Sequence, residues 1–172
     1  MEANQNDMNE TVKLVALVNK RLDPGVAMNA LAHAVAAGVN LIGDEGRTSL
    51  KFLDFTDGNG QVYRGISARS FIVLRGTDGD IRKVRQSALE AGLPAVCFTN
   101  SMTGETYVQQ LERTKATPTQ ELTFYAIVLV GRAEAVNPIT KKYSLWRSEP
   151  ASPPTTTRAR NELAVEEHAV GT

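Results

Sequence analysis

Residues Thr11 to Gly38 read T-V-K-L-V-A-L-V-N-K-R-L-D-P-G-V-A-M-N-A-L-A-H-A-V-A-A-G, and this stretch decides the fold that we expect. Val12 to Val18 is apolar except for Lys13, a pattern typical of a strand that is covered on both faces. Asp23 and Pro24 predict a helix start, because Asp can accept hydrogen bonds from free amides and Pro needs no donor there. The stretch therefore predicts a buried strand, a sharp turn and a helix.

Small side chains form the inner face of this predicted helix. Alanine dominates the positions that recur at helical spacing, and Gly38 predicts the end of the helix. An alanine face lets a helix approach a sheet closely and leaves little room for larger side chains. The inward positions are Ala27, Ala30, Leu31, Ala34 and Val35.

Asn29 and His33 lie one turn apart on a second stripe of the same helix. Their spacing allows the two side chains to meet or to share a ligand. Two interpretations stay open. The pair is a candidate site near a helix start, or each side chain hydrogen-bonds to a neighbouring loop.

The composition limits the classes of protein to which the chain can belong. With 172 residues and a hydrophobic content of 42%, it can hold one ordinary domain plus tails. The 19 basic and 19 acidic side chains balance, so the charge does not predict tRNA binding, although a local binding surface stays open. The single cysteine, Cys97, lies in the apolar run A-V-C-F, which favours a buried thiol over a nucleophile. We expect a cytoplasmic protein without a signal peptide or a membrane span.

The rest of the chain alternates strands and helices. A hairpin from Leu50 to Ile66 is predicted to turn at Asp57-Gly58-Asn59-Gly60, because these residues accept positive φ. Ser70 to Phe98 reads β-α-β, so its two strands should be parallel. Phe124 to Val130 predicts a hydrophobic strand, and Asn137-Pro138 predicts a short helix through Tyr143. Two more helices are expected at Asp78 to Ala91 and at Glu105 to Thr114, the latter with Tyr107, Val108 and Leu111 as its apolar side.

The opening unit resembles that of type 2 peptidyl-tRNA hydrolases, in which a Gly-Lys step opens a helix with a Gln and a Ser-His-Ala run. Gly25 and the run Ala32-His33-Ala34 match that spacing. The family lysine falls on Val26 and the helix Gln falls on Ala30. Farther along, Asn100 stands where the family Asp would be, and the Arg-Thr pair after it is absent. The resemblance therefore implies the fold and argues against the hydrolase activity.

A closer resemblance is to a bacterial branch of the same superfamily, the domain of unknown function 2000 family. The chain is similar to it in the hairpin turn D-F-T-D-G-N-G-Q, in the step Ile66-Ser67 and in the ending Leu145-Trp146-Arg147. The resemblance covers roughly Val12 to Arg147. They imply a bacterial protein of that family without implying a mechanism.

With this resemblance, the predicted fold is a three-layer α/β/α domain. Its sheet is expected to be mixed, mainly parallel and four-stranded, as in type 2 peptidyl-tRNA hydrolases, with the β-hairpin as an insertion. The predicted domain covers residues 11–147. Residues 1–10 are polar and predict a flexible N-terminus, and the Pro-, Ser- and Thr-rich residues 148–172 predict a disordered tail.

A site is predicted where the parallel strands end, because ligands of open α/β sheets bind outside the carboxyl ends of the strands. This edge would be polar with some positive charge, suited to an anionic or amide-bearing ligand, and the alternative is a set of ordinary polar loops. No cofactor or metal is predicted, because HExxH, paired-Cys and phosphate-loop motifs are absent from the sequence. The predicted ligand-binding residues are Asn29, His33, Arg75, Thr99, Asn100 and Ser101, and the candidate catalytic residues are Lys20, His33 and Asn100.

Three classes of function stay open at this point. The first is a non-hydrolase binding module for a small ligand or partner. The second is a divergent hydrolase of peptidyl-tRNA or of another ester or amide, which would need Lys20 or Arg21 in place of the family lysine. The third is an oligomeric module, expected as a homodimer because related hydrolases form dimers.

Overall fold

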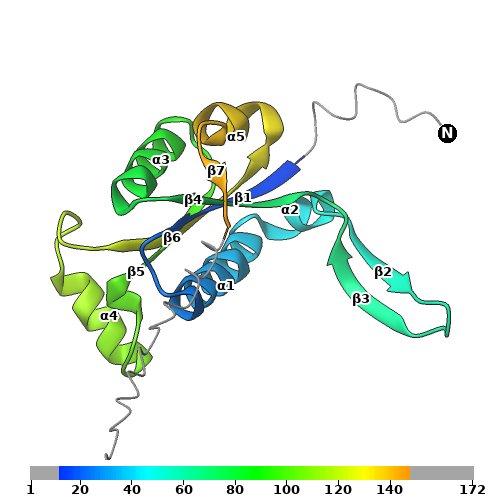
Figure 1. Cartoon of the computed structure of the whole chain (residues 1–172), viewed down its shortest axis with the longest axis horizontal. Coiled ribbons are helices and arrows are strands. Elements are labelled where there is room, and N and C mark those ends of the chain that lie inside the picture. Colours follow the sequence, from blue (N-terminus) through cyan, green and yellow to red (C-terminus); the bar gives the residue numbers. More distant parts are fainter. Residues whose placement is uncertain (1–11, 148–172) are drawn as a thin grey trace, which may run out of the picture.

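A five-stranded sheet runs through the middle of the computed structural model, which describes residues 12–147 (Figure 1). At its centre, β1 (Val12–Asn19) pairs parallel with β4 (Phe71–Gly76) and antiparallel with β6 (Phe124–Arg132). At the edges, β5 (Ala95–Thr99) pairs antiparallel with β6, and β7 (Ser144–Leu145) pairs antiparallel with β4. The strand order is β5-β6-β1-β4-β7, so the prediction of a mixed sheet is confirmed. The prediction of a mainly parallel sheet was wrong: three of the four strand pairings are antiparallel, because β6 is inserted between β1 and β5 and β7 is added at the edge.

The sheet has one strand more than the four that the sequence predicts, and this additional strand is β7. It is two residues long, and its pairing continues where the backbone N–H of Trp146 donates to the carbonyl oxygen of Val73 over 2.8 Å. Two residues are too few to show the alternation by which a strand is recognised. The prediction of four strands was therefore wrong by this short edge strand.

Helices cover both faces of the sheet (Figure 1). α1 (Pro24–Leu41) packs on one face, and α3 (Asp78–Glu90) and α5 (Ala133–Thr140) pack on the other. Alternate residues of β1 enter two separate core clusters: Leu14, Ala16 and Val18 belong to the cluster with α1, whereas Val15 and Leu17 belong to the cluster with α3 and α5. The prediction that this strand is covered on both faces is confirmed.

The opening helix is longer than the sequence predicts. Gly38 is buried inside α1, and a Cβ added to it would lie 3.3 Å from Cγ1 of Val128, so glycine here permits close packing on β6 and does not end the helix. α1 ends at Leu41, and a second short helix, α2 (Gly43–Ser49), follows it directly. Asp23 occupies the N-cap position, but its side chain makes no capping hydrogen bond.

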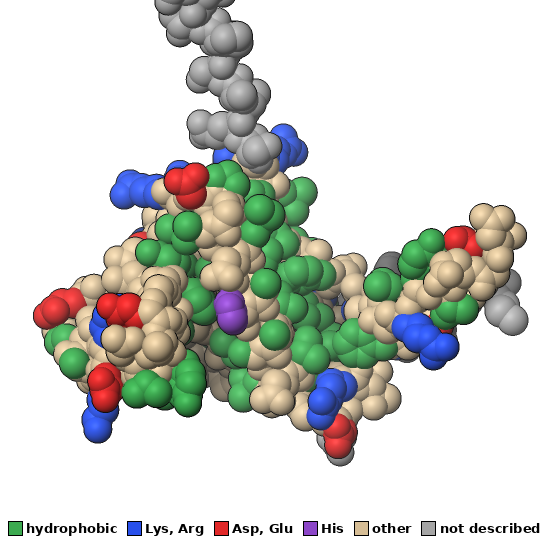
Figure 2. All heavy atoms as spheres, turned by 90° about the horizontal axis from the view of Figure 1, so that it is seen from below, with side chains coloured by type: hydrophobic (Ala, Val, Ile, Leu, Met, Phe, Trp, Pro, Cys, Tyr) green, Lys and Arg blue, Asp and Glu red, His purple; other side chains and the backbone are tan. Residues whose placement is uncertain are grey.

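The predicted hairpin is confirmed and forms a sheet of its own. β2 (Phe52–Thr56) and β3 (Val62–Ser67) project away from the main sheet (Figures 1 and 2). The carboxylate of Asp57 accepts hydrogen bonds from the backbone N–H groups of Asn59 (2.9 Å) and Gln61 (3.0 Å) and so stabilises the turn. These bonds hold the pKa of Asp57 below its ordinary value.

The last two helices depart from the predicted pattern. α5 begins at Ala133, so Pro138 lies inside the helix and does not start it. Ala133 and Val136 are buried against the sheet, and this packing outweighs the Asn-Pro signal for a helix start. α4 (Tyr107–Ala116) is confirmed as a helix, but its apolar side is exposed, with Leu111 67% accessible. None of the helices within residues 12–147 has the length and apolar character that crossing a membrane requires.

Candidate ligand-binding site at the carboxyl ends of two parallel strands

A cavity of about 490 Å³ opens where β1 and β4 end. Three segments form its walls: the turn between β1 and α1, the end of β4, and the residues that follow β7. We call it the cationic cavity. Its lining residues are Lys20, Arg21, Leu22, Pro24, Arg75, Trp146 and Arg147.

The turn that carries Lys20 and Arg21 is fixed by a buried amide. Asn19 is 3% exposed, and its Nδ2 donates to the carbonyl oxygen of Phe124 over 3.1 Å. Its Oδ1 accepts a hydrogen bond from the backbone N–H of Arg21 over 3.1 Å. The backbone N–H of Lys20 donates to the carbonyl oxygen of Gly76 over 2.8 Å, which joins the turn to the end of β4. β4 and β6 thus hold the turn in place without any ligand.

Positive charge dominates the cationic cavity. Lys20, Arg21, Arg75 and Arg147 line it, and no acidic side chain is among the described residues of its wall. The ion pairs within residues 12–147 involve other cations, so these four are not neutralised there. Cations gathered in a concave site favour an anion, and guanidinium groups suit carboxylate or phosphate oxygens because they donate in pairs.

The structure places Asn29 and His33 outside this cavity. Each is exposed on α1, and neither side chain hydrogen-bonds to another residue in the described part of the chain. The ring of His33 stacks on Phe98 of β5, with 5.3 Å between ring centroids and 18° between the planes. His33 therefore packs beside β5 and not at the ends of β1 and β4.

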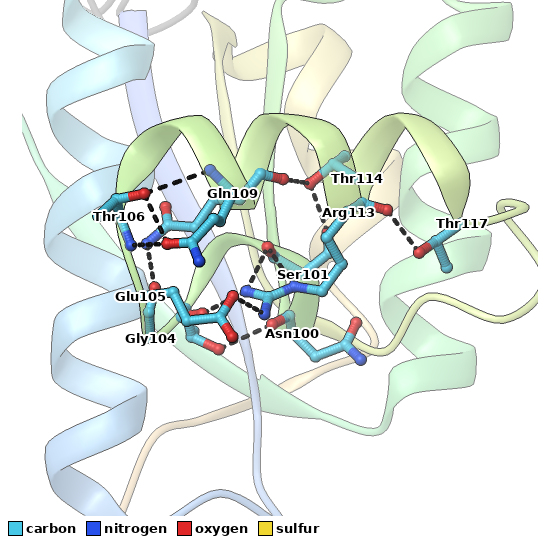
Figure 3. Close-up of polar contacts among 11 residues, drawn as sticks. Asn100, Ser101, Gly104, Glu105, Thr106, Gln109, Arg113, Thr114 and Thr117 are labelled. Atoms are coloured by element: carbon cyan, nitrogen blue, oxygen red, sulfur yellow. Dashed lines mark hydrogen bonds and ion pairs between the residues drawn. The ribbon is translucent and has the colours of Figure 1, made fainter.

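Asn100 and Ser101 belong to the network of hydrogen bonds around α4 that Figure 3 shows, and the Thr99 hydroxyl joins this network through Ser101. Thr99 and Ser101 are each 2% exposed, and their hydroxyl oxygens lie 2.8 Å apart. The carbonyl oxygen of Ser101 accepts from Nε (3.1 Å) and Nη2 (2.9 Å) of Arg113. Oδ1 of Asn100 accepts from the backbone N–H of Thr123 over 2.9 Å. These side chains already bond within the protein, and none of them lines the cationic cavity.

The strand order explains why the predicted site residues are not all together. β6 lies between β1 and β5, and β1 and β6 both lie between β4 and β5. Neighbouring strands are about 4.8 Å apart, so the ends of β4 and β5 are separated by about 14 Å. Of the predicted residues, Arg75 and Lys20 come together at the cationic cavity, whereas Thr99, Asn100 and Ser101 lie beyond β6.

The sequence prediction omitted Trp146 and Arg147 from the site. Both are on the cavity wall because β7 pairs with β4 and places Trp146 beside Val73, close to the end of that strand. The ending Leu145-Trp146-Arg147 was a usable signal, since its short apolar and aromatic run precedes a cation. Its place in the sheet could not be read from the sequence.

Cys97 and the acidic residues add no chemistry to this site. Burial raises the pKa of the Cys97 thiol to about 11, and the nearby Arg85 opposes that rise only in part. The thiol is thus protonated near neutral pH. Within residues 12–147, no three His, Cys, Asp or Glu side chains are grouped as a metal site requires.

Comparisons with known proteins identify a family and a fold. The model of the family described as "Protein of unknown function (DUF2000)" matches residues 12–147. A solved structure, the protein of unknown function Atu0240 from Agrobacterium tumefaciens strain C58, is similar with a TM-score of 0.66 and 20% sequence identity. The match covers 80% of this chain and 98% of that one, and at this identity it shows a shared fold. No curated protein matches the chain.

Proposed function

The chain belongs to this family of unknown function, and we propose that it is a non-hydrolase binding module for a small anionic ligand. One observation carries the proposal: four cations that have no acidic partner among residues 12–147 line one cavity at the carboxyl ends of β1 and β4. Like charges repel across a shared cavity, and a bound anion removes that repulsion. The volume of about 490 Å³ lies in the range of small-molecule sites.

The wall of the cationic cavity favours binding over hydrolysis. General acid–base catalysis needs a group that can exchange protons near neutral pH, most often His, Asp or Glu. The described residues of this wall include none of these, nor a Ser, Thr or Cys that could act as a nucleophile. His33, the family-matching histidine, stacks on Phe98 instead.

The second candidate is a divergent hydrolase of the type 2 peptidyl-tRNA hydrolase-like superfamily, to which we assign the family by resemblance. The place of the family Gln is taken by Ala30, which is fully buried against the sheet, so no polar group substitutes there. The place of the family lysine is taken by Val26, 40% exposed. Lys20 and Arg21, which the sequence offers as substitutes for that lysine, line the cationic cavity and favour an anionic ligand equally well without catalysis.

Isothermal titration of the full chain with pyrophosphate, at low ionic strength, tests the binding proposal. We expect a single site whose affinity falls about tenfold or more in Arg75→Ala, because a charge-assisted hydrogen bond contributes roughly 1.5–3 kcal/mol. Arg64→Ala is the matched control, since Arg64 lies on the exposed hairpin away from the cavity. The proposal is wrong if wild-type protein does not bind pyrophosphate, or if Arg75→Ala binds it as tightly as Arg64→Ala does.

A peptidyl-tRNA hydrolysis assay separates the two candidates. We expect no hydrolysis above the uncatalysed rate. Hydrolysis that disappears in both Lys20→Ala and His33→Ala would instead establish the hydrolase and would contradict a binding-only role.

A further inference from the structure

A second hollow lies directly beside the cationic cavity and is different in character. Its volume is about 420 Å³, and every described residue of its wall is apolar. It lies between α1 and the strands β1, β4 and β7. We call it the apolar cleft, and its lining residues are Val18, Pro24, Ala27, Met28, Leu31, Val73, Leu145 and Trp146.

The apolar cleft and the cationic cavity share two wall residues, Pro24 and Trp146. Trp146 is held at this border, because its backbone N–H donates to the carbonyl oxygen of Val73 and its side chain packs on the α1 core cluster. Arg75 and Arg147 also line a smaller hollow with Leu145, a residue of the apolar cleft. Charged and apolar binding surfaces thus adjoin without an intervening element.

We propose that these two hollows form one site for an amphiphilic anion, a small molecule with a phosphate or carboxylate group joined to an aliphatic or aromatic group. This inference rests on the proposed function, because it uses the cationic cavity as the anion-binding half. The anionic group lies among Lys20, Arg21, Arg75 and Arg147, and the apolar group passes Trp146 into the cleft.

The chemistry of the walls selects this class of ligand over its simpler alternatives. A purely polar anion would leave the apolar cleft filled with water, although burial of apolar surface there is favourable. A neutral apolar molecule would leave the four cations without a partner. The rim residues Met28 and Leu145 are 64% and 54% exposed in the free protein, and an apolar group in the cleft would cover them. Met is flexible and adapts to ligands of different shape.

Titration calorimetry with methyl, butyl and hexyl phosphate tests the inference on the full chain. Each buried methylene contributes about 0.8 kcal/mol, so affinity should rise about fourfold per added methylene until the cleft is full. Hexanol, which has the same chain without the anion, should bind at least tenfold more weakly than hexyl phosphate. A carboxylate series, acetate to heptanoate, then shows which anionic group is preferred.

Single substitutions at the rim assign the effect to the cleft. In Met28→Gln and Leu145→Gln we expect the gain with chain length to shrink. Met28 lines the apolar cleft but neither hollow that contains the arginines, so in Met28→Gln methyl phosphate should bind as in wild type. Leu41→Gln is the matched control, because Leu41 is an exposed leucine of α1 that does not line the cleft. Both rim residues are exposed, so the variants should fold, and circular dichroism checks this.

The outcomes separate this inference from the proposal on which it rests. If pyrophosphate and methyl phosphate bind but longer chains bring no gain in affinity, the proposal of an amphiphilic ligand is wrong and the proposal of an anion site stands. Hexanol that binds as tightly as hexyl phosphate would also overturn it, because the charge would then play no part. If neither the phosphates nor the carboxylates bind, both proposals are wrong.

Discussion

Asp80 shows how a single carboxylate fixes the start of a helix in this fold. Its Oδ2 accepts from the backbone N–H of Thr77 (2.9 Å) and from the Thr77 hydroxyl (2.7 Å), and the Thr77 hydroxyl oxygen accepts from the backbone N–H of Asp80. These hydrogen bonds favour the charged form and hold the pKa of Asp80 below its ordinary value of 3.8. The result is a capping box, a reciprocal pair of hydrogen bonds between Thr77 and Asp80 at the start of α3.

We expect Asp80→Ala to lower the free energy of unfolding by about 1 kcal/mol at pH 7, the usual effect of losing a cap. Because the pKa is lower in the folded state, this stabilisation is present above the ordinary value of 3.8 and is lost as the pH falls through the folded value. Urea unfolding of wild type and variant between pH 7 and pH 3 should show the difference shrinking. Glu112→Ala, which removes an exposed helical carboxylate, should have little effect at either pH. An equal difference at both ends of the range would contradict this account.

Cys97 should be unreactive in the folded protein. Its pKa of about 11 leaves only a small fraction of thiolate at neutral pH, whereas an unfolded cysteine has a pKa of about 8.5. Alkylation by iodoacetamide at pH 7.5 should therefore be about two orders of magnitude slower in the folded chain than in urea. The chain has a single cysteine, so mass spectrometry reads the reaction directly. Similar rates in the two states would show that the thiol is neither buried nor protonated.

At the scale of elements, α1 depends on side chains that are small enough to meet the sheet. Ala30 and Ala34 are fully buried, and Gly38 lies against Val128 one turn farther along. We expect Ala30→Leu to destabilise the domain by about 1–3 kcal/mol, because the added atoms must displace α1 or distort β6. Ala32 faces solvent on the same helix, so Ala32→Leu is the control and should change stability by less than about 0.5 kcal/mol. Chemical denaturation measures both, and equal effects would show that the helix face is not tightly packed.

Patterns of neighbouring residues in the sequence predicted most of the helices and strands. Most of the features that the sequence did not predict depend on pairing between strands that are far apart in the chain. The strand β1, the hairpin and α3 follow from periodicity and turn residues within a short stretch, and each is confirmed. Gly38 was predicted to end the helix, but it lies inside α1. A glycine is needed there because β6, which is far away in sequence, packs closely against the helix. The insertion of β6 between β1 and β5 is likewise invisible in the sequence, and it separates Thr99 and Ser101 from Arg75. Arg147 reached the site only through the edge pairing of β7.

At the scale of the whole molecule, the main domain and the hairpin are nearly independent. Neither core cluster contains a residue of β2 or β3. The hairpin instead exposes large apolar side chains at Phe52, Leu53, Phe55, Val62, Tyr63 and Ile66. A two-stranded hairpin contributes little stability of its own. Its base is closed on the domain side, where the backbone N–H of Ala68 donates to the carbonyl oxygen of Lys51 over 2.9 Å and the Ser67 hydroxyl donates to the carbonyl oxygen of buried Leu50 over 2.7 Å.

This closed base makes the hairpin removable. We expect replacement of residues 52–66 by a Gly-Gly turn to leave thermal unfolding cooperative and the free energy of unfolding within about 1 kcal/mol of wild type, since the core is intact and the shorter loop costs less entropy. Pyrophosphate binding should be unchanged, because no hairpin residue lines the cationic cavity.

Ser67→Ala in the full chain is the complementary variant. It keeps the hairpin, removes the hydrogen bond to the carbonyl oxygen of Leu50, and should lower the free energy of unfolding by roughly 1 kcal/mol. If the shortened chain loses cooperative unfolding or pyrophosphate binding, the hairpin is part of the domain's structure. The six exposed apolar side chains would then have a role within this chain.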